Sequence, residues 1–393
     1  MNRREFLKVA GTAGTAAATF ESLGPEAFGA QTDHGLKTKH IIVIINGNGA
    51  RKKEYYERED IAVQIRELIR HSTVFTEDHG NNVSNHGVMF TEYLTGMDIS
   101  SDQPLYPTYK HYARKVRQDE ATKYWYLNPV AYYRQWRFHK KYFTTYPGFG
   151  VDTRGVSMQC QDIFFEDNKT SPAEIVAHQF PDDMGITAKE RKQIEEFIAG
   201  VLQKRSWDPS LKTPFPQRSP MMEEGPALQL VPQVLQAFKP RIITVQMVAH
   251  DTGHGAGGYL RDETGYLEYS AVAKSTDEMI RKIYDFVRND PYFSTNTAII
   301  IRPETGRDDE VNLYGEIHHS DGYYYAHRPA SIWYGPDFKE GVVIKDVVNR
   351  MDMCPTLAWL MGVDKTFAKG YVRPHMFKSH VTGVPAYTSI TRT

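Results

Sequence analysis

A carboxylate and an imidazole stand three residues apart at Asp251 and His254, directly after His250. Both side chains can converge on one cation from the same turn, and zinc accepts such a mixture of oxygen and nitrogen ligands while leaving a position for water or substrate. His250 can replace either residue. In the alternative interpretation, Asp251 caps the following turn and His254 is a solvated loop residue. This loop is therefore a candidate site for a divalent metal.

A second polar set begins at Glu304 and continues with Arg307, and His318 and His319 follow about a dozen residues later. A Glu-Thr-Gly-Arg turn alone is typical of a solvated loop, but the paired histidines add two nitrogen ligands. Arg307 supplies a cation that can hold an anionic group.

Two further groups of candidate site residues lie earlier in the chain, at Asn48 and at the segment Ser84-Asn85-His86. Asn48 belongs to an Asn-Gly-Asn-Gly turn that follows an apolar run. Ser84 and His86 stand at the start of a predicted helix, where free N–H groups and the helix dipole favour a phosphate or sulfate. An ordinary N-cap explains Ser84 equally well.

The elements that must position these residues alternate between strands and helices. Short β-branched runs predict strands at 40–45, 242–248, 297–301 and 331–334, and helical spacing predicts helices at 57–70, 84–96, 266–287 and 346–361. The alternation indicates a three-layer α/β/α sandwich with a mostly parallel central sheet. Ligands of such sheets bind at the carboxyl ends of the strands, where these polar residues follow.

Composition narrows the classes of function. The 393 residues include 47 Lys and Arg against 48 Asp and Glu, so the near-neutral net charge disfavours a nucleic-acid partner. The two cysteines, Cys160 and Cys354, allow one disulfide but no cysteine-rich zinc site. A metal in this protein must therefore use histidines and carboxylates.

The first 30 residues predict export. Arg3-Arg4-Glu5-Phe6-Leu7-Lys8 precedes a mildly apolar stretch and small residues near Ala30, which is typical of a twin-arginine signal peptide; a basic helix arising by chance is the alternative. No apolar run reaches the roughly 20 residues that span a bilayer. We expect the twin-arginine machinery to carry the precursor, and the mature protein to be periplasmic or secreted.

The mature chain is predicted to form one α/β domain over 38–393. Within this domain, the segment 106–217 differs in composition, because it is rich in Tyr, Trp, Arg and Lys. This segment is expected to be an insertion or elaboration, either a cap over the site or an extended edge of the sheet.

Several ordered segments resemble the alkaline phosphatase superfamily. Asp251-Thr252-Gly253-His254 resembles its first metal-binding loop, 297–307 resembles its strand followed by Asp-His-Gly, and 331–337 with 351–358 resembles its closing strand and its Asp-x-x-Pro-Thr helix. The resemblance implies an alkaline phosphatase-like fold, a bimetallic site of zinc or calcium, and a Ser, Thr or modified Cys nucleophile that attacks a phosphate or sulfate ester.

The sequence departs from that family pattern at three places. Asn48 replaces an aspartate, Glu304-Thr305 replaces an Asp-His pair, and the nucleophile position counted back from Thr95-Gly96 falls on His86, two residues from Ser84. The lost aspartate and histidine weaken the second metal site.

Together these features predict an exported, metal-dependent hydrolase of phosphate or sulfate esters with a degenerate second metal site. The predicted metal ligands are Asp251, His254, His319, Asn48 and Glu304, and the predicted catalytic residues are His86, Ser84 and Arg307. The metal is expected to be zinc, with calcium as the alternative, and the partner is an anionic ester substrate. The competing hypothesis is an inactive relative that binds a ligand or a protein in the periplasm; a purely structural protein is a third class.

Overall fold

The structure is a computed structural model. It describes residues 28–29, 34–47, 49–80, 86–98, 107–128, 156–159, 171–179, 186–204, 225–247, 250, 267–307, 319 and 324–385. Within them, no helix is both long and apolar enough to cross a membrane.

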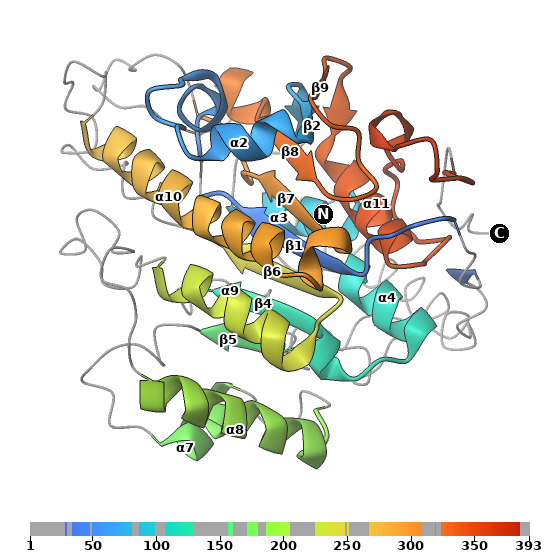
Figure 1. Ribbon diagram of the computed structural model, residues 1–393. Helices are drawn as coiled ribbons and strands as arrows, with labels where there is room; N and C mark the ends of the chain where they lie inside the picture. Colours follow the sequence, from blue (N-terminus) through green and yellow to red (C-terminus); the bar gives the residue numbers. More distant parts are fainter. Residues whose placement is uncertain are drawn as a thin grey trace, which may run out of the picture.

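An eight-stranded sheet forms the middle of the molecule, in the order β5-β4-β6-β1-β7-β8-β2-β9 (Figure 1). The strands are β1 His40–Ile45, β2 Ser72–Phe75, β4 Tyr124–Asn128, β5 Val156–Gln159, β6 Ile242–Gln246, β7 Thr297–Arg302, β8 Ser331–Tyr334 and β9 Val342–Ile344. Only β8 pairs in the antiparallel sense among these strands. A small second sheet pairs β3 Asp78–His79 with β10 Val348–Asn349. The predicted mostly parallel sheet is confirmed.

Helices cover both faces of the sheet. The helices are α2 Ile65–Arg70, α3 His86–Thr95, α4 Tyr109–Arg117, α7 Pro172–Gln179, α8 Ala188–Lys204, α9 Gly225–Phe238, α10 Leu267–Asn289 and α11 Met353–Leu360. α10 packs against α2 and α9, while α11 packs against α3 and α4 (Figure 1). The two groups form the outer layers of the predicted α/β/α sandwich.

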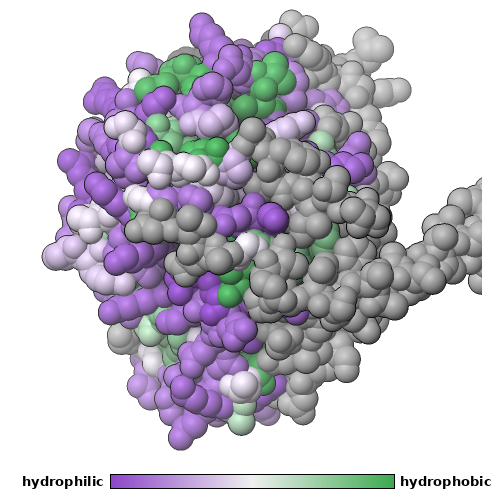
Figure 2. Space-filling model, turned by 90° about the vertical axis from the view of Figure 1, so that its right-hand side faces the viewer, coloured by the Kyte–Doolittle hydropathy of each residue, from purple (hydrophilic) through white to green (hydrophobic). Residues whose placement is uncertain are grey.

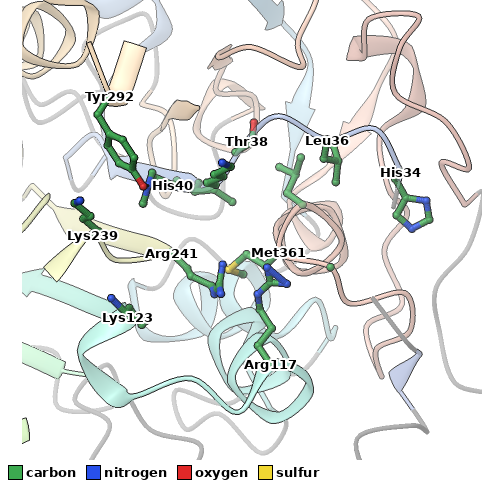
Figure 3. A pocket seen from close by; sticks show the side chains of 14 residues that line it. His34, Leu36, Thr38, His40, Arg117, Lys123, Lys239, Arg241, Tyr292 and Met361 are labelled. Atoms are coloured by element: carbon green, nitrogen blue, oxygen red, sulfur yellow. The ribbon is translucent and has the colours of Figure 1, made fainter. Parts of the chain in front are cut away.

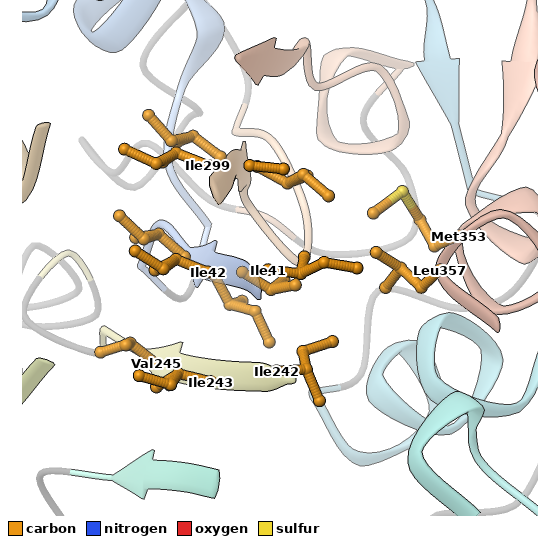
Figure 4. Packing of buried hydrophobic residues seen from close by; sticks show 14 of the residues in the cluster. Ile41, Ile42, Ile242, Ile243, Val245, Ile299, Met353 and Leu357 are labelled. Atoms are coloured by element: carbon orange, nitrogen blue, oxygen red, sulfur yellow. The ribbon is translucent and has the colours of Figure 1, made fainter. Parts of the chain in front are cut away.

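The core lies between these layers because the central strands are apolar on both faces. Every residue of β1, β6 and β7 is buried. Ile41 and Ile242 point toward Met353 of α11, whereas Ile42 and Val245 point to the opposite face (Figure 4). This alternation follows from the two-residue period of a strand, and burial on both faces is typical of parallel strands.

Two predicted helices are shorter than expected. The helix predicted at 57–70 begins at Ile65, after a separate π-helical turn at Lys53–Glu57. The helix predicted at 346–361 begins at Met353, because β10 and a 3₁₀ turn, Arg350–Asp352, occupy its first half.

Parts of the aromatic segment 106–217 join the main sheet. β4 pairs with β6, and β5 pairs with β4, so both strands extend one side of the sheet. α7 packs against β5 at that side. For its described residues, this arrangement corresponds to an extended edge; the domain boundaries themselves stay predictions.

Candidate active site

The carboxyl ends of β1, β6 and β7 lie together because these three strands are parallel neighbours. Ile45, the last residue of β1, is in register with Gln246 and Arg302, the last residues of the other two strands. The Asn46 N–H donates to the Arg302 carbonyl at 3.1 Å, and the Met247 N–H donates to the Ile45 carbonyl at 3.0 Å. Three loops that are distant in sequence therefore leave the sheet at one edge.

The turn after β1 is built on two glycines with positive φ, +72° at Gly47 and +78° at Gly49. A Cβ on Gly47 would overlap the His250 ring, and a Cβ on Gly49 would lie 2.7 Å from His319 Cδ2 and 3.1 Å from Arg307 Nε. Glycine supplies both the left-handed conformation and the missing Cβ. The side chains of His250, His319 and Arg307 therefore pack directly against this glycine turn.

Arg307 joins the three segments around this turn. Its Nε donates to the Gly49 carbonyl, and its Nη2 donates to the His250 carbonyl at 2.8 Å. The guanidinium lies 5.3 Å from the centre of the Tyr269 ring, an arrangement that favours a cation. Arg307 is 1% exposed, so the surrounding backbone fixes its position.

Tyr269, which the sequence does not mark as a site residue, contacts both the glycine turn and His250. Its hydroxyl donates to the Gly49 carbonyl at 3.2 Å and accepts the Arg51 N–H at 2.6 Å. Its ring lies 5.4 Å from the His250 ring. No sequence pattern marks this tyrosine, because its role arises from the packing of α10 over the turn.

His250 is a neutral imidazole in this environment. Burial, and then the charge of Arg307, lower the pKa of His250 to about 3. Its Nδ1 has no hydrogen-bond partner among the described residues. A neutral ring with an available lone pair is the form that binds a metal or accepts a proton.

Glu304 follows β7 and is buried among arginines. Its backbone carbonyl accepts from Arg302 Nη1 at 3.3 Å and from Arg350 Nη1 at 3.1 Å. Arg350 in turn lies 3.0 Å from the Glu92 carboxylate, and burial lowers the pKa of Arg350. The edge of the sheet where β7 ends is thus rich in buried guanidinium groups, which the sequence does not predict.

The structure places part of the predicted site. Arg307 and His319 meet at Gly49, Glu304 is buried after β7, and His86 is the first residue of α3. The predicted site residues that lie outside the described part of the chain are Asn48, Ser84, Asp251 and His254. Within the described part, no three His, Cys, Asp or Glu side chains form a group that could hold a metal. The complete ligand set therefore stays a prediction.

Comparisons with known proteins identify the fold. No family model and no curated protein matches the sequence. A variant of alkaline phosphatase PafA has a TM-score of 0.55 at 9% identity, with 87% of this chain and 99% of that chain covered. The PsFucS1 sulfatase from Pseudoalteromonas sp. has a TM-score of 0.48 at 12% identity, with coverage of 83% and 68%.

A protein of the alkaline phosphatase superfamily from Vibrio parahaemolyticus has a TM-score of 0.46 at 13% identity, and the match covers 84% of this chain and 68% of that one. Similarity at such low identity concerns the fold. The resemblance found in the sequence is thus confirmed at the level of the fold, because the chain has the fold of alkaline phosphatase PafA.

Proposed function

We propose that the protein is an exported, metal-dependent hydrolase of phosphate or sulfate esters. The observation that carries the proposal is the meeting of His250, His319 and Arg307 on the glycine turn at the carboxyl ends of β1, β6 and β7. Ligand sites of parallel sheets lie at this edge. The alkaline phosphatase fold supports the reaction class, and the twin-arginine segment supports export to the periplasm.

The side chains at this edge suit one dication. Glu304 offers a carboxylate and His319 an imidazole, and His250 is buried and neutral. Asp251, His254 and Asn48 complete the proposed ligand set from the neighbouring loops. Because nitrogen donors are mixed with oxygen donors, the set favours zinc over calcium, which prefers oxygen alone. When bound, the metal supplies a Lewis acid that polarises the ester oxygen.

The buried arginines support a degenerate second metal site. Arg307 occupies space beside Gly49 and His319, and Arg302 and Arg350 both donate to the carbonyl of Glu304. Arg302 and Arg350 are paired with the carboxylates of Asp78 and Glu92, at 3.1 Å and 3.0 Å, so these side chains fill this edge of the sheet with ion pairs rather than with ligands for a second dication. The replacements Asn48 and Thr305 remove ligands from the same position, so both features favour a mononuclear site.

The proposed catalytic residues stand at the start of α3 and after β7. His86 or Ser84 would attack the ester or activate water, where the α3 N-terminus favours an anionic group. Arg307 would balance the charge of the ester, and its backbone contacts hold its guanidinium in place for that role.

The test combines metal analysis with turnover. Protein purified from the periplasm is expected to carry about one zinc per chain, and to hydrolyse aryl phosphates or aryl sulfates until a chelator removes the metal. Asp251→Ala should remove both metal and turnover, whereas Asp60→Ala, at a side chain that is 57% exposed, should keep both.

Stoichiometric metal without turnover on any ester would favour the alternative function, an inactive relative that binds a ligand or a protein. The absence of metal from active, folded protein would contradict the proposal. Separate Ser84→Ala and His86→Ala variants then assign the nucleophile, because only its loss should abolish the reaction while metal binding persists.

A further inference from the structure

The opposite edge of the sheet, where the strands begin, holds a cavity of about 710 Å³ (Figure 3). Ile41 of β1 pairs with Ile242 of β6, which pairs with Tyr124 of β4, so the residues just before these strands gather at this edge. Figure 2 shows the molecule from this side, and its coloured atoms are mainly hydrophilic. The cavity is thus separate from the candidate active site.

The lining of this cavity is strongly basic. Among the residues that the structure describes, the lining has no carboxylate and five lysine and arginine side chains: Lys39, Arg117, Lys123, Lys239 and Arg241. The volume lies within the range of about 300–1,000 Å³ that is typical of small-ligand sites.

The Asp119 carboxylate, beside the lining residues Arg117 and Arg241, already accepts hydrogen bonds. Asp119 accepts from Arg241 through Nε and Nη2, and from the Tyr124 hydroxyl at 3.0 Å. Arg117 Nε lies 3.9 Å from this carboxylate, beyond hydrogen-bond distance. The buried Nε and Nη1 of Arg117 have no hydrogen-bond partner among the described residues. These two nitrogens are shielded from solvent, and 14% of the side chain is exposed, so Arg117 acts on a ligand in the cavity mainly through its positive charge.

The positive charges of the lining also lower the pKa values of neighbouring basic groups. Burial lowers the pKa of Arg117, and the nearby charge of Arg241 lowers it further. Burial also lowers the pKa of His40, the Pro240 carbonyl opposes that shift, and the charges of Arg241 and two lysines add to it.

The negative ends of three helix dipoles offset only part of this positive charge. α4 and α9 end beside the cavity at Arg117 and Phe238, and Lys123 Nζ donates to the Phe238 carbonyl at 2.6 Å. α11 ends at Leu360, which lines the cavity. Each helix end carries roughly half a negative charge. Even with Asp119 included, and with Asp364 beside the lining residue His34, an excess of roughly one to two positive charges remains.

We infer that this cavity binds a small polyanion that carries several phosphate or sulfate groups. Arg117 and Arg241 bring two guanidinium charges to the lining, although Arg241 uses its Nε and Nη2 on Asp119, and such charges attract phosphate and sulfate oxygens. Lys239 lies with its Nζ 4.7 Å from the centre of the Tyr292 ring, and the exposed Lys39 adds a second ammonium group. The apolar Leu36 and Met361 offer a surface for the body of the ligand.

Titration calorimetry on the full-length mature protein tests the inference. Inorganic tripolyphosphate and a polysulfated disaccharide serve as probes, and the unsulfated disaccharide serves as the neutral control. We expect at least one polyanion to bind and the neutral sugar not to bind. The tighter of the two polyanions identifies phosphate or sulfate as the group recognised.

Charge-removing variants locate the binding. Lys39→Gln combined with Lys239→Gln removes two exposed charges and should weaken binding about tenfold or more. Arg117→Gln should have an effect of similar size. The matched control, Lys189→Gln with Lys192→Gln, removes two charges from α8, where the side chains are 72% and 78% exposed.

The control should leave the affinity unchanged. The inference is overturned if neither polyanion binds, or if the control pair weakens binding as much as the cavity variants do. Because the readout is binding rather than turnover, these outcomes are independent of the proposed hydrolase activity.

Discussion

At the scale of single residues, Gly49 is the position on which the candidate active site depends most. Its backbone has a positive φ of +78°, and its carbonyl accepts hydrogen bonds from Arg307 and Tyr269. A Cβ at this position would lie 2.7 Å from His319 Cδ2. The site therefore needs glycine here for two separate reasons, conformation and space.

Gly49→Ala is predicted to destabilise the fold by about 1–2 kcal/mol from the backbone strain alone, and to displace His319 in addition. Gly200→Ala is the matched control, since it lies inside α8 and a Cβ there meets nothing within 4 Å. The control should stabilise by about 0.5–1 kcal/mol because alanine favours helix. Urea denaturation of both variants measures the contrast, and equal shifts would refute this account of the turn.

Some of the site could be predicted from single residues and some could not. The Asn-Gly turn, Arg307 and His319 follow strands or lie in loops that the apolar runs identify, so the contacts of Gly49 with Arg307 and His319 could be expected. Tyr269 could not be foreseen, because its contacts depend on how α10 crosses the turn. The buried arginines at the edge where β7 ends were missed for the same reason.

At the scale of elements, α2 shows how tertiary contacts set a helix boundary. Asp277 of α10 accepts the N–H groups of Gln64 at 2.6 Å and Ile65 at 2.7 Å. A capping carboxylate from another helix thus fixes the start of α2, which local spacing had predicted at residue 57. Sequence periodicity cannot report a cap that arrives from more than two hundred residues away.

Asp277 also makes stability depend on pH. Burial raises the pKa of Asp277 to about 6, against the opposing hydrogen bonds from Gln64 and Ile65. The folded state thus holds a proton that the unfolded chain has released, so this stabilisation is full below about pH 4 and is lost as the pH rises through 6.

We predict that wild-type stability, relative to Asp277→Asn, falls by up to about 3 kcal/mol between pH 4 and pH 7. Urea denaturation of both proteins across this range provides the measurement. A difference that stays constant with pH would contradict the assignment.

Two elements that the sequence did not predict, β4 and α9, share a physical cause. β4 reads Tyr-Trp-Tyr-Leu-Asn, which is aromatic rather than β-branched, and α9 contains Pro232 inside the helix. Both elements are stabilised by packing on the sheet, since α9 contacts β4 and β6. Local propensity is a weak guide where such contacts dominate.

At the scale of the whole molecule, a buried ion network joins segments that are far apart in the chain. Asp78 of β3 lies 3.1 Å from Arg302 of β7 and 2.8 Å from Arg373 near the other end of the described chain. All three side chains are nearly inaccessible to solvent, and the two arginines lower the pKa of Asp78 despite the opposing effect of burial.

Asp78→Asn is predicted to destabilise the protein by about 3–5 kcal/mol, because it removes the counter-charge of the buried Arg302 and leaves Arg373 with the Asp352 carboxylate at 3.8 Å. Asp60→Asn, which breaks the exposed pair with Arg58, should cost less than about 1 kcal/mol. The midpoints of urea unfolding at pH 7 compare the two. Similar losses would show that the buried network carries no special weight.

The fold itself could largely be predicted, because β1, β6, β7 and β8 are short apolar runs that alternate with amphipathic helices. The order of the strands could not be derived from these patterns. Pairing between strands is set by three-dimensional packing, and β2, which the apolar runs do not predict, lies between β8 and β9 near one edge of the sheet.

The position of β1 between β6 and β7 has a consequence for biosynthesis. The ribosome delivers His40–Ile45 early, but the partners in register with this strand emerge roughly two hundred residues later. Until then its isoleucines have no sheet to join, and chaperones in the cytoplasm are the means by which cells shield such surface. The nascent chain therefore cannot pair β1 with β6 until Gln246 has been synthesised, and it cannot enclose β1 between two strands until Arg302 has followed.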